Sequence, residues 1–348
     1  MELNQTQIAE DHCLNNLWNL SDVSTINDAS YSAIEDLFFK IFLPFIEIIG
    51  VLGNLAFILM VMRVPHMRTI TNRYLLNIAV ADLLFIGYAC TFYIVAYFNS
   101  PIRNDAPFDS WVGCIVSWLP IYLTYFASIL LISFATFEKY YGICRPLQHR
   151  LVRGKTRTMR IITMSWFLSA VTSSLVVLRY AKLQIFCVMY PDEGIFVDYP
   201  KRIGFCVSIH PKVLVFSETM TIVPFFFALI GNVYMYGRII HTLSHRQNRT
   251  DTAMKNRIII MQKQIRNQVA RLLIINGVIF FCCQLPYRML SINLFVQEAT
   301  GHGFLSTSQY GVLAVTARCL VLINSCANPF VYFVCNSGYR NGFRQMFS

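Results

Sequence analysis

A single carboxylate lies within one of the most apolar parts of this sequence. Asp82 is the only charged residue between positions 74 and 98. Hydroxyl and amide side chains lie at comparable depth in other apolar segments, namely Asn54, Ser128, Asn324, Ser325 and Asn328. Hard cations such as sodium take oxygen ligands of these kinds, so the set predicts a sodium or proton site. The alternative is a hydrogen-bond network that only joins helices to one another.

Two arginines also interrupt long apolar segments. Arg288 follows Tyr287 in one of them, and Arg318 lies in the next. A guanidinium group that faces the interior of a helical bundle binds carboxylate or carbonyl oxygen atoms with its planar set of donors. Charged residues at such depth usually face a cavity, so we expect both arginines to contact a ligand. The alternatives are extension of the side chains to the membrane interface or pairing with Glu218 or Glu298.

Apolar segments of unusual length must position these side chains. The seven segments are residues 41–62, 74–98, 111–137, 161–178, 213–237, 272–296 and 303–338. A helix that crosses a bilayer needs about 20 apolar residues, and backbone groups in lipid must be paired within the segment. Hydrophobic residues make up 55% of the chain, charged residues 14%, and the mean hydropathy is +0.50. The sequence therefore predicts an all-α membrane protein, a seven-transmembrane helix bundle.

The net charge of +11 is distributed unevenly along the chain. Residues 1–39 contain acidic residues but no Lys or Arg, whereas the loops after the first, third and fifth segments are rich in both. Because cytoplasmic loops carry the excess of basic residues, we expect the N-terminus outside and no nucleic acid as partner. The chain then divides into an extracellular tail (1–37), a transmembrane domain (38–338) and a short cytoplasmic helix (339–348).

The predicted cytoplasmic helix is amphipathic. Tyr339, Phe343 and Phe347 recur at intervals of four residues, which places them on one face of a helix. Such a helix lies on a membrane surface, so we expect contact with lipid of the inner leaflet. Gly342 lies within the same stretch and weakens its helix propensity.

The extracellular side carries modification and disulfide candidates. Asn4 and Asn19 each begin an Asn-x-Thr/Ser tripeptide and are expected to be glycosylated. Cys114 lies at the outer start of the third segment, and Cys187 and Cys206 lie in the long loop before the fifth. Oxidation is allowed there. We prefer a Cys114–Cys206 bridge because Cys206 lies close to the fifth segment, with Cys187 as the alternative partner. Residues 184–206 alternate apolar positions around a turn at 191–194, which predicts a β-hairpin over the bundle.

Short motifs or single residues in every segment together make the sequence resemble the rhodopsin-like G-protein-coupled receptors. They are Gly53-Asn54, Leu76 to Asp82, Cys114, Glu138-Lys139-Tyr140 with Pro146, Trp166, Pro224, Phe280, Cys283-Gln284-Leu285-Pro286 and Asn328-Pro329-Phe330-Val331-Tyr332. The resemblance covers roughly residues 38 to 348. It implies a plasma-membrane receptor that signals to a heterotrimeric G protein. It also implies a sodium pocket at Asp82, Ser128, Asn324, Ser325 and Asn328, a disulfide at Cys114, and activation switches at Glu138, Lys139, Tyr140, Phe280, Gln284, Pro286 and Tyr332.

The sequence departs from the family pattern at three positions. Lys139 replaces the family's arginine, which keeps a cation but loses the planar fork of donors. Gln284 replaces the family's tryptophan in the sixth segment, so the relay from ligand to G protein is expected to use Phe280 and a polar network. Asn232 replaces the tyrosine that usually follows the fifth-segment proline, with Tyr234 close by.

The ligand-facing residues are similar to those of thyrotropin-releasing-hormone receptors and their invertebrate relatives. Tyr122, Tyr287 and Arg318 match residues that grip a small amidated peptide in that family, and Arg288 lies beside them. Phe126 stands where those receptors carry asparagine. The resemblance therefore implies a short extracellular neuropeptide, with an amidated C-terminus, as the ligand.

Two other hypotheses about function are compatible with the sequence. The first is an orphan or constitutively active receptor with a non-peptide ligand, which the changes at Lys139 and Gln284 favour. The second is a membrane transporter, against which stands the absence of an inverted repeat in the sequence. The sequence shows no His/Cys spacing typical of a metal site and no set of residues typical of a catalytic nucleophile. We therefore expect no enzyme activity, no catalytic residues and no cofactor besides the allosteric sodium ion.

Overall fold

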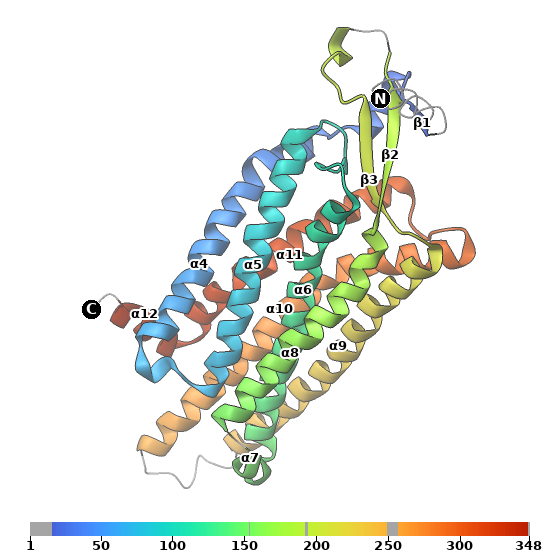
Figure 1. Ribbon diagram of the computed structural model, residues 1–348. Helices are drawn as coiled ribbons and strands as arrows, with labels where there is room; N and C mark the ends of the chain where they lie inside the picture. The colour runs from blue at the N-terminus through green and yellow to red at the C-terminus, as the bar shows by residue number, and fades with distance from the viewer. Residues whose placement is uncertain (1–15, 153, 192–193, 249–256, 347–348) are drawn as a thin grey trace.

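The computed structural model describes residues 16–152, 154–191, 194–248 and 257–346. Within these ranges seven helices are long and apolar enough to cross a membrane, and they pack side by side in one bundle (Figure 1). They are α4 (Leu43–Arg63, continuing α3 Ala33–Leu37 and the π-helical η1 Phe38–Phe42), α5 (Ile70–Asn99), α6 (Trp111–Cys144), α8 (Lys155–Val176), α9 (Pro211–Asn248), α10 (Arg257–Thr300) and α11 (Thr307–Cys335). The predicted seven-helix architecture is confirmed.

Most of these helices are longer than their apolar segments. α9 and α10 extend into the basic loop between them, because the lipid limits only the apolar part of a helix and not its polar ends. The seventh segment was predicted too long at both ends. α11 begins after Ser306, whose side chain accepts a hydrogen bond from the N–H of Gln309 and so caps the helix. It ends at Cys335, and Asn336 has an extended backbone.

The outer surface of the bundle is apolar, and its interior contains polar side chains beside an apolar core. Phe227 is 81% exposed and Val334 is 71% exposed on the outer surface, where lipid replaces water as the solvent. On α8, Ser165, Ser169 and Ser173 are fully buried at intervals of four residues. Their hydroxyls donate to carbonyl oxygens of their own helix. These small, internally satisfied residues allow α8 to pack closely against α6.

A small sheet stands at the extracellular end of the bundle, and its long strands rise away from the helices (Figure 1). β2 (Lys182–Met189) and β3 (Arg202–Val207) are antiparallel, with Leu183 opposite Cys206, so the predicted hairpin is confirmed. The connection is longer than the predicted turn and contains the 3₁₀ helix η4 (Gly194–Phe196). A third strand, β1 (Leu17–Asn19), comes from the N-terminal segment and pairs with β2 in parallel. This strand was not predicted.

The N-terminal segment packs into the sheet instead of extending away from it. Helix α2 (Val23–Ala29) begins at Asp22, whose carboxylate accepts from the N–H of Ser24. Buried apolar side chains of the segment, the first outer loop and the sheet form one cluster, made of Leu20, Ile26, Ile102, Val188 and Ile203. Extracellular residues before the first span therefore form a cap with its own apolar core.

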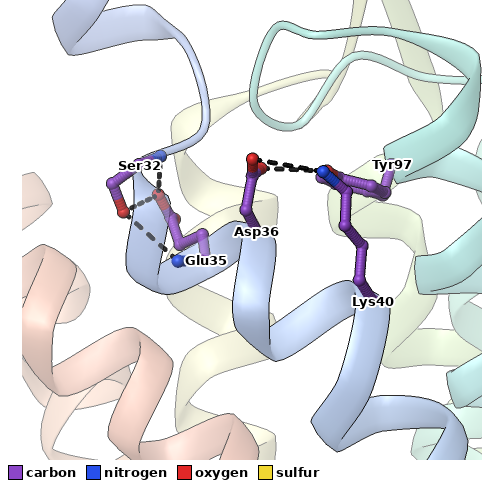
Figure 2. Close-up of polar contacts among 5 residues, drawn as sticks. All are labelled: Ser32, Glu35, Asp36, Lys40 and Tyr97. Carbon is purple, nitrogen blue, oxygen red and sulfur yellow. Dashed lines mark hydrogen bonds and ion pairs between the residues drawn. The ribbon is translucent and has the colours of Figure 1, made fainter.

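Polar contacts fix the entry to the first span (Figure 2). The carboxylate of Glu35 accepts from the N–H of Ser32 at 2.9 Å, and the Ser32 hydroxyl accepts in return from the N–H of Glu35 at 3.4 Å. The hydroxyl of Tyr97 on α5 donates to Asp36 at 2.9 Å, and Lys40 lies 3.4 Å from the same carboxylate. These contacts join the first two spans at their outer ends.

The disulfide pairs Cys114 with Cys206, as we preferred from the sequence. It joins the outer start of α6 to β3, with the Cα atoms 5.6 Å apart. Cys187 is itself disulfide-bonded, so the alternative pairing with Cys114 is wrong. Asn19 lies exposed on β1, and Asn4 lies outside the described residues.

The cytoplasmic helix α12 (Ser337–Met346) is present, but Tyr339 does not face lipid as expected. Its side chain is 3% exposed, and its hydroxyl donates to Asn72 Oδ1 at 2.5 Å. Gly342 lies against the first span and its loop, where an added Cβ would stand 2.6 Å from Met67 Cε. The glycine that weakens the helix locally thus allows it to dock on the bundle. Phe347 lies outside the described residues.

Candidate functional site

Two neighbouring cavities, which share lining residues, lie between the outer halves of the helices. The outer one has a volume of about 460 Å³, within the range of about 300–1,000 Å³ that is typical of small-ligand sites. The inner one holds about 60 Å³. Tyr93, Tyr287 and Arg318 line both. The four residues that the sequence nominated for ligand binding, Tyr122, Tyr287, Arg288 and Arg318, all line the inner cavity.

Arg288 lies between aromatic rings and not beside an acid. It is 2% exposed, and its guanidinium carbon is 4.5 Å from the ring centre of Tyr125 and 5.1 Å from that of Tyr287. Rings hold a cation by their faces without using its hydrogen-bond donors. In the part of the chain that the structure describes, Nε and Nη1 of Arg288 have no hydrogen-bond partner. Arg288 therefore keeps donors for an oxygen atom supplied from outside.

Arg318 stands on α11 at the junction of the cavities. Its guanidinium carbon is 5.7 Å from the ring centre of Tyr93 on α5. Over the described ranges, neither Arg318 nor Arg288 forms an ion pair. The alternative that Glu218 or Glu298 neutralises Arg288 or Arg318 is therefore wrong. Glu298 lies exposed at the end of α10, and Glu218 has another partner.

That partner is Arg179, which the sequence analysis missed. Arg179 lies in the 3₁₀ helix η3 (Val177–Tyr180) after α8, and its Nη1 contacts Glu218 Oε1. The next residue, Tyr180, stacks on Trp118 with ring centres 4.5 Å apart, and its hydroxyl lies 3.4 Å from that of Tyr122. The only sequence signal for this pair was an arginine directly after the apolar segment 161–178. The sequence could not indicate its partner, because Arg179 and Glu218 are far apart along the chain.

Acidic residues on the outer rim are satisfied locally. Glu35 pairs with Arg103 at 3.1 Å, and Asp105 accepts from the N–H of Gly204 at 2.9 Å. Burial raises the pKa of Asp105, and the hydrogen bond from Gly204 opposes this rise. Burial also raises the pKa of Tyr31 to about 12, while the charge of Arg318 acts to lower it. Among the described residues, Glu35 and Asp105 therefore bind groups other than Arg318.

The candidate sodium site lies at the bottom of the inner cavity. Its five nominated residues, Asp82, Ser128, Asn324, Ser325 and Asn328, are all at most 8% exposed. Asn328 Nδ2 donates to Asp82 Oδ2 at 2.5 Å, and Asn54 donates to the carbonyl oxygen of Ser325 at 3.0 Å. Among the described atoms, Oδ1 of Asn324 has no donor. A carboxylate beside unsatisfied amide oxygen suits a hard cation.

Glu138, one of the predicted switch residues, has partners that the sequence did not indicate. Its carboxylate is 2.7 Å from His149 Nε2 and 3.8 Å from Arg157. His149 belongs to α7 (Pro146–Val152), so the second inner loop holds this acid. The adjacent Lys139 is half-buried.

The remaining switch residues occupy the core. Phe280 and Gln284 line the inner cavity above them, and Pro286 lies inside α10. Tyr140 is 9% exposed, and Tyr332 is fully buried 4.7 Å from the ring of Phe57. Phe280 and Gln284 thus lie at the inner cavity and Tyr140 and Tyr332 in the buried interior, and their role as switches stays a prediction.

The tyrosine that fills the space beside α6 is Tyr236, not Tyr234. Tyr234 is 60% exposed on the lipid face, whereas Tyr236 is 6% exposed. The hydroxyl of Tyr236 lies 3.2 Å from Thr136 Oγ1, and Asn232 donates to Ser133 at 2.9 Å. Both contacts join α9 to α6 near the cytoplasmic end.

Comparison with known proteins agrees with this geometry. Residues 53–332 match the 7 transmembrane receptor (rhodopsin family). The galanin receptor 2a of Danio rerio is 25% identical over 321 residues, which cover 92% of this chain and 80% of that protein. The thyrotropin-releasing hormone receptor of Bos taurus is 27% identical over 326 residues, covering 86% and 75%. The allatostatin-A receptor of Bombyx mori is 24% identical over 314 residues, covering 88% and 78%.

The fold and the site define a seven-helix membrane receptor. Because the family match covers most of the chain, the protein belongs to the rhodopsin family of seven-transmembrane receptors. It is a multi-pass plasma-membrane protein and a receptor, not an enzyme.

Proposed function

We propose that the protein is a receptor for a short extracellular peptide with an amidated C-terminus, and that it activates a heterotrimeric G protein. The observation that carries the proposal is the pair Arg288 and Arg318. Both guanidinium groups line a cavity, and neither is neutralised by an acid among the described residues. A carboxamide or a carboxylate offers the oxygen that such a group binds, and Tyr122 and Tyr287 supply aromatic walls beside it. The amide is chosen because the ligand-facing residues resemble those of thyrotropin-releasing-hormone receptors.

The similar proteins support a peptide as the ligand. Three of them are named as receptors for galanin, thyrotropin-releasing hormone and allatostatin-A. A further relative is named as a tachykinin-like peptides receptor of Drosophila melanogaster. The outer cavity opens under the β2–β3 hairpin, and Phe205 and Cys206 of that hairpin line it. A peptide would therefore enter beside the cap and reach the arginines below it.

Signalling would proceed by a shift between two populations of the bundle. A ligand changes this equilibrium only by binding one state more tightly. We infer that the peptide favours an outward position of the cytoplasmic half of α10, which opens a cleft lined by Lys139 and the basic third inner loop. Pro286 lies inside α10 between the ligand residues and Phe280, at the point where a helix bends most readily.

Sodium would act on the same equilibrium in the opposite direction, by favouring the resting state. Asp82 and Ser128 would hold the ion together with Asn324 and Ser325, which line the same part of the inner cavity. Asn328 would orient the carboxylate through its hydrogen bond to Asp82. The ion supplies a positive charge that compensates the buried carboxylate.

A screen of short peptides in cells that express the receptor tests the proposal. Each tripeptide is made as the C-terminal amide and as the free acid, and calcium and cyclic-AMP responses are recorded. We expect responses to a subset of amides, with weaker responses to the matching acids. Basal signalling without any peptide response would contradict a peptide ligand. Ion flux through the purified protein in vesicles would instead indicate a transporter.

A further inference from the structure

The buried pair of Arg179 and Glu218 uses only part of its hydrogen-bonding capacity. Glu218 is fully buried, and the side chain of Arg179 is 11% exposed. One nitrogen of Arg179 contacts one oxygen of Glu218. In the described structure, Nε of Arg179 and Oε2 of Glu218 have no hydrogen-bond partner. Buried polar atoms without partners are costly, so a missing donor and a missing acceptor are expected to be supplied when the receptor is occupied.

The pair forms part of the wall of the outer cavity. Arg179, Tyr180 and Glu218 line it on the side of η3 and α9, and Arg318 lines it on the side of α11. The guanidinium carbon of Arg179 is 5.0 Å from the ring centre of Tyr180, and the stack of Tyr180 on Trp118 holds that ring. These ring contacts orient Arg179 at the cavity wall, and a small rotation of the pair would present Nε of Arg179 and Oε2 of Glu218 to a ligand.

A pair with one positive and one negative charge has no net charge to compensate another ion. A carboxylate or ammonium group placed beside it would lose water without gaining a counter-charge. An uncharged amide supplies one N–H donor and one oxygen acceptor, which match the acid and the guanidinium respectively. This chemistry separates the wall at Arg179 from the wall at Arg318, whose cation forms no ion pair with any described residue and so favours oxygen alone.

We propose that Arg179 and Glu218 form a specificity subsite for an uncharged amide group of the peptide, at the end of the peptide away from Arg318. The inference rests on the proposed function, and it adds a second constraint on the ligand. The amide belongs to a side chain such as that of glutamine or asparagine. Rejection of charged groups follows from the neutral pair and not from the size of the cavity.

The test uses pooled tripeptides that are N-acetylated and C-terminally amidated. The first residue is Gln, Glu or Lys, and the other two positions are randomised. Calcium responses give a half-effective concentration for each pool. On the native receptor we expect the Gln pool to be more potent than either charged pool by about tenfold or more, since mispaired buried charges are strongly disfavoured.

Neutralising one partner should create a preference between the Lys and Glu pools, and the charge that remains sets its direction. Arg179→Gln leaves the Glu218 carboxylate uncompensated, so the Lys pool should gain about tenfold over the Glu pool. Glu218→Gln leaves the Arg179 cation uncompensated, so the Glu pool should gain instead. Each ratio is measured on one variant, so it does not depend on surface level. Lys182→Gln and Glu298→Gln remove exposed charges of the same signs and should leave the ratio unchanged.

A second variant covers the case in which a single neutralisation prevents surface expression. Arg179→Glu combined with Glu218→Arg keeps a neutral pair but exchanges the places of donor and acceptor. We expect surface expression with about tenfold weaker response to the Gln pool. A native response by this variant, or an unchanged Glu-to-Lys ratio in the single variants, would show that the pair only braces the helices. A native receptor that responds to no pool would overturn the proposed peptide function together with this subsite.

Discussion

At the scale of single residues, the inner cavity is marked by two arginines that form no ion pair within the described ranges. Arg288 is held by the rings of Tyr125 and Tyr287, and Arg318 lies over Tyr93. A ring face attracts a guanidinium group yet leaves its N–H donors unused. By contrast, Arg179 has Glu218 as partner, so the arginines that line the two cavities take different roles.

Replacing Arg318 tests the ligand role directly. Arg318→Ala should raise the half-effective concentration of an active amidated peptide by about 10- to 150-fold, because a hydrogen bond to a charged group contributes about 1.5–3 kcal/mol. Arg318→Lys should recover only part of this loss, since an ammonium group cannot form the two-pronged contact. Dose–response curves at matched surface expression measure both. Native potency in both variants would mean that the peptide does not contact Arg318.

Replacing Asp82 tests the sodium site. If sodium favours the resting state, adding sodium should lower agonist affinity in the native receptor, and Asp82→Asn should abolish this effect because the full counter-charge is lost. Agonist binding at several sodium concentrations measures the effect. Glu47→Gln is the matched control, because Glu47 is another carboxylate of the spans but accepts from Thr91 at 3.3 Å. A native receptor insensitive to sodium would reduce the cluster to a hydrogen-bond network that joins helices.

At the scale of elements, the contact between α9 and α10 depends on one glycine. A Cβ added at Gly277 would stand 1.8 Å from the hydroxyl oxygen of Tyr236. That hydroxyl is buried beside Thr136 of α6, so Tyr236 cannot move without losing this contact. Gly277 therefore allows the cytoplasmic halves of three helices to meet around one tyrosine.

Gly277→Ala should destabilise the resting bundle. Overpacking of this kind costs about 1–3 kcal/mol, so the thermal midpoint of the purified receptor should fall. Gly231→Ala on α9 is the control, because no atom lies within 4 Å of the added Cβ. That change should leave the midpoint unchanged or raise it, since alanine favours helix over glycine. Equal midpoints for the two variants would show that Tyr236 leaves its site without cost.

At the scale of the whole molecule, the outer cavity and the cytoplasmic surface must be coupled through the bundle. The cavity residues Phe280 and Gln284 lie on α10, the same helix whose cytoplasmic half meets Tyr236. At the cytoplasmic end, His149 and Arg157 hold Glu138. The second inner loop therefore holds the acid that precedes Lys139.

Lys139→Arg tests the coupling step. We expect a higher maximal response to agonist, because an arginine can donate from a rigid fork to the backbone of a G protein and a compact ammonium cannot. The resting state should change less, since His149 and Arg157 already engage Glu138. Dose–response curves at matched surface expression decide the matter. An unchanged or reduced maximum would contradict the prediction.

The sequence by itself determined the features that depend on local composition. The length of the apolar segments sets the number of spans, and the distribution of Lys and Arg predicts their orientation. The polar residues inside those segments also predicted a cluster correctly. Asp82, Ser128 and Asn324 come from three helices, yet each must face the interior because lipid excludes it.

Only the tertiary structure decided which side chains meet. Tyr234 and Tyr236 are two residues apart, so they point about 200° apart around a helix, and only packing shows which one faces α6. Glu218 pairs with Arg179 and Glu138 with His149, because pairing depends on side-chain distances between elements. Burial makes a polar residue seek a partner, but the partner is chosen by the positions of whole helices.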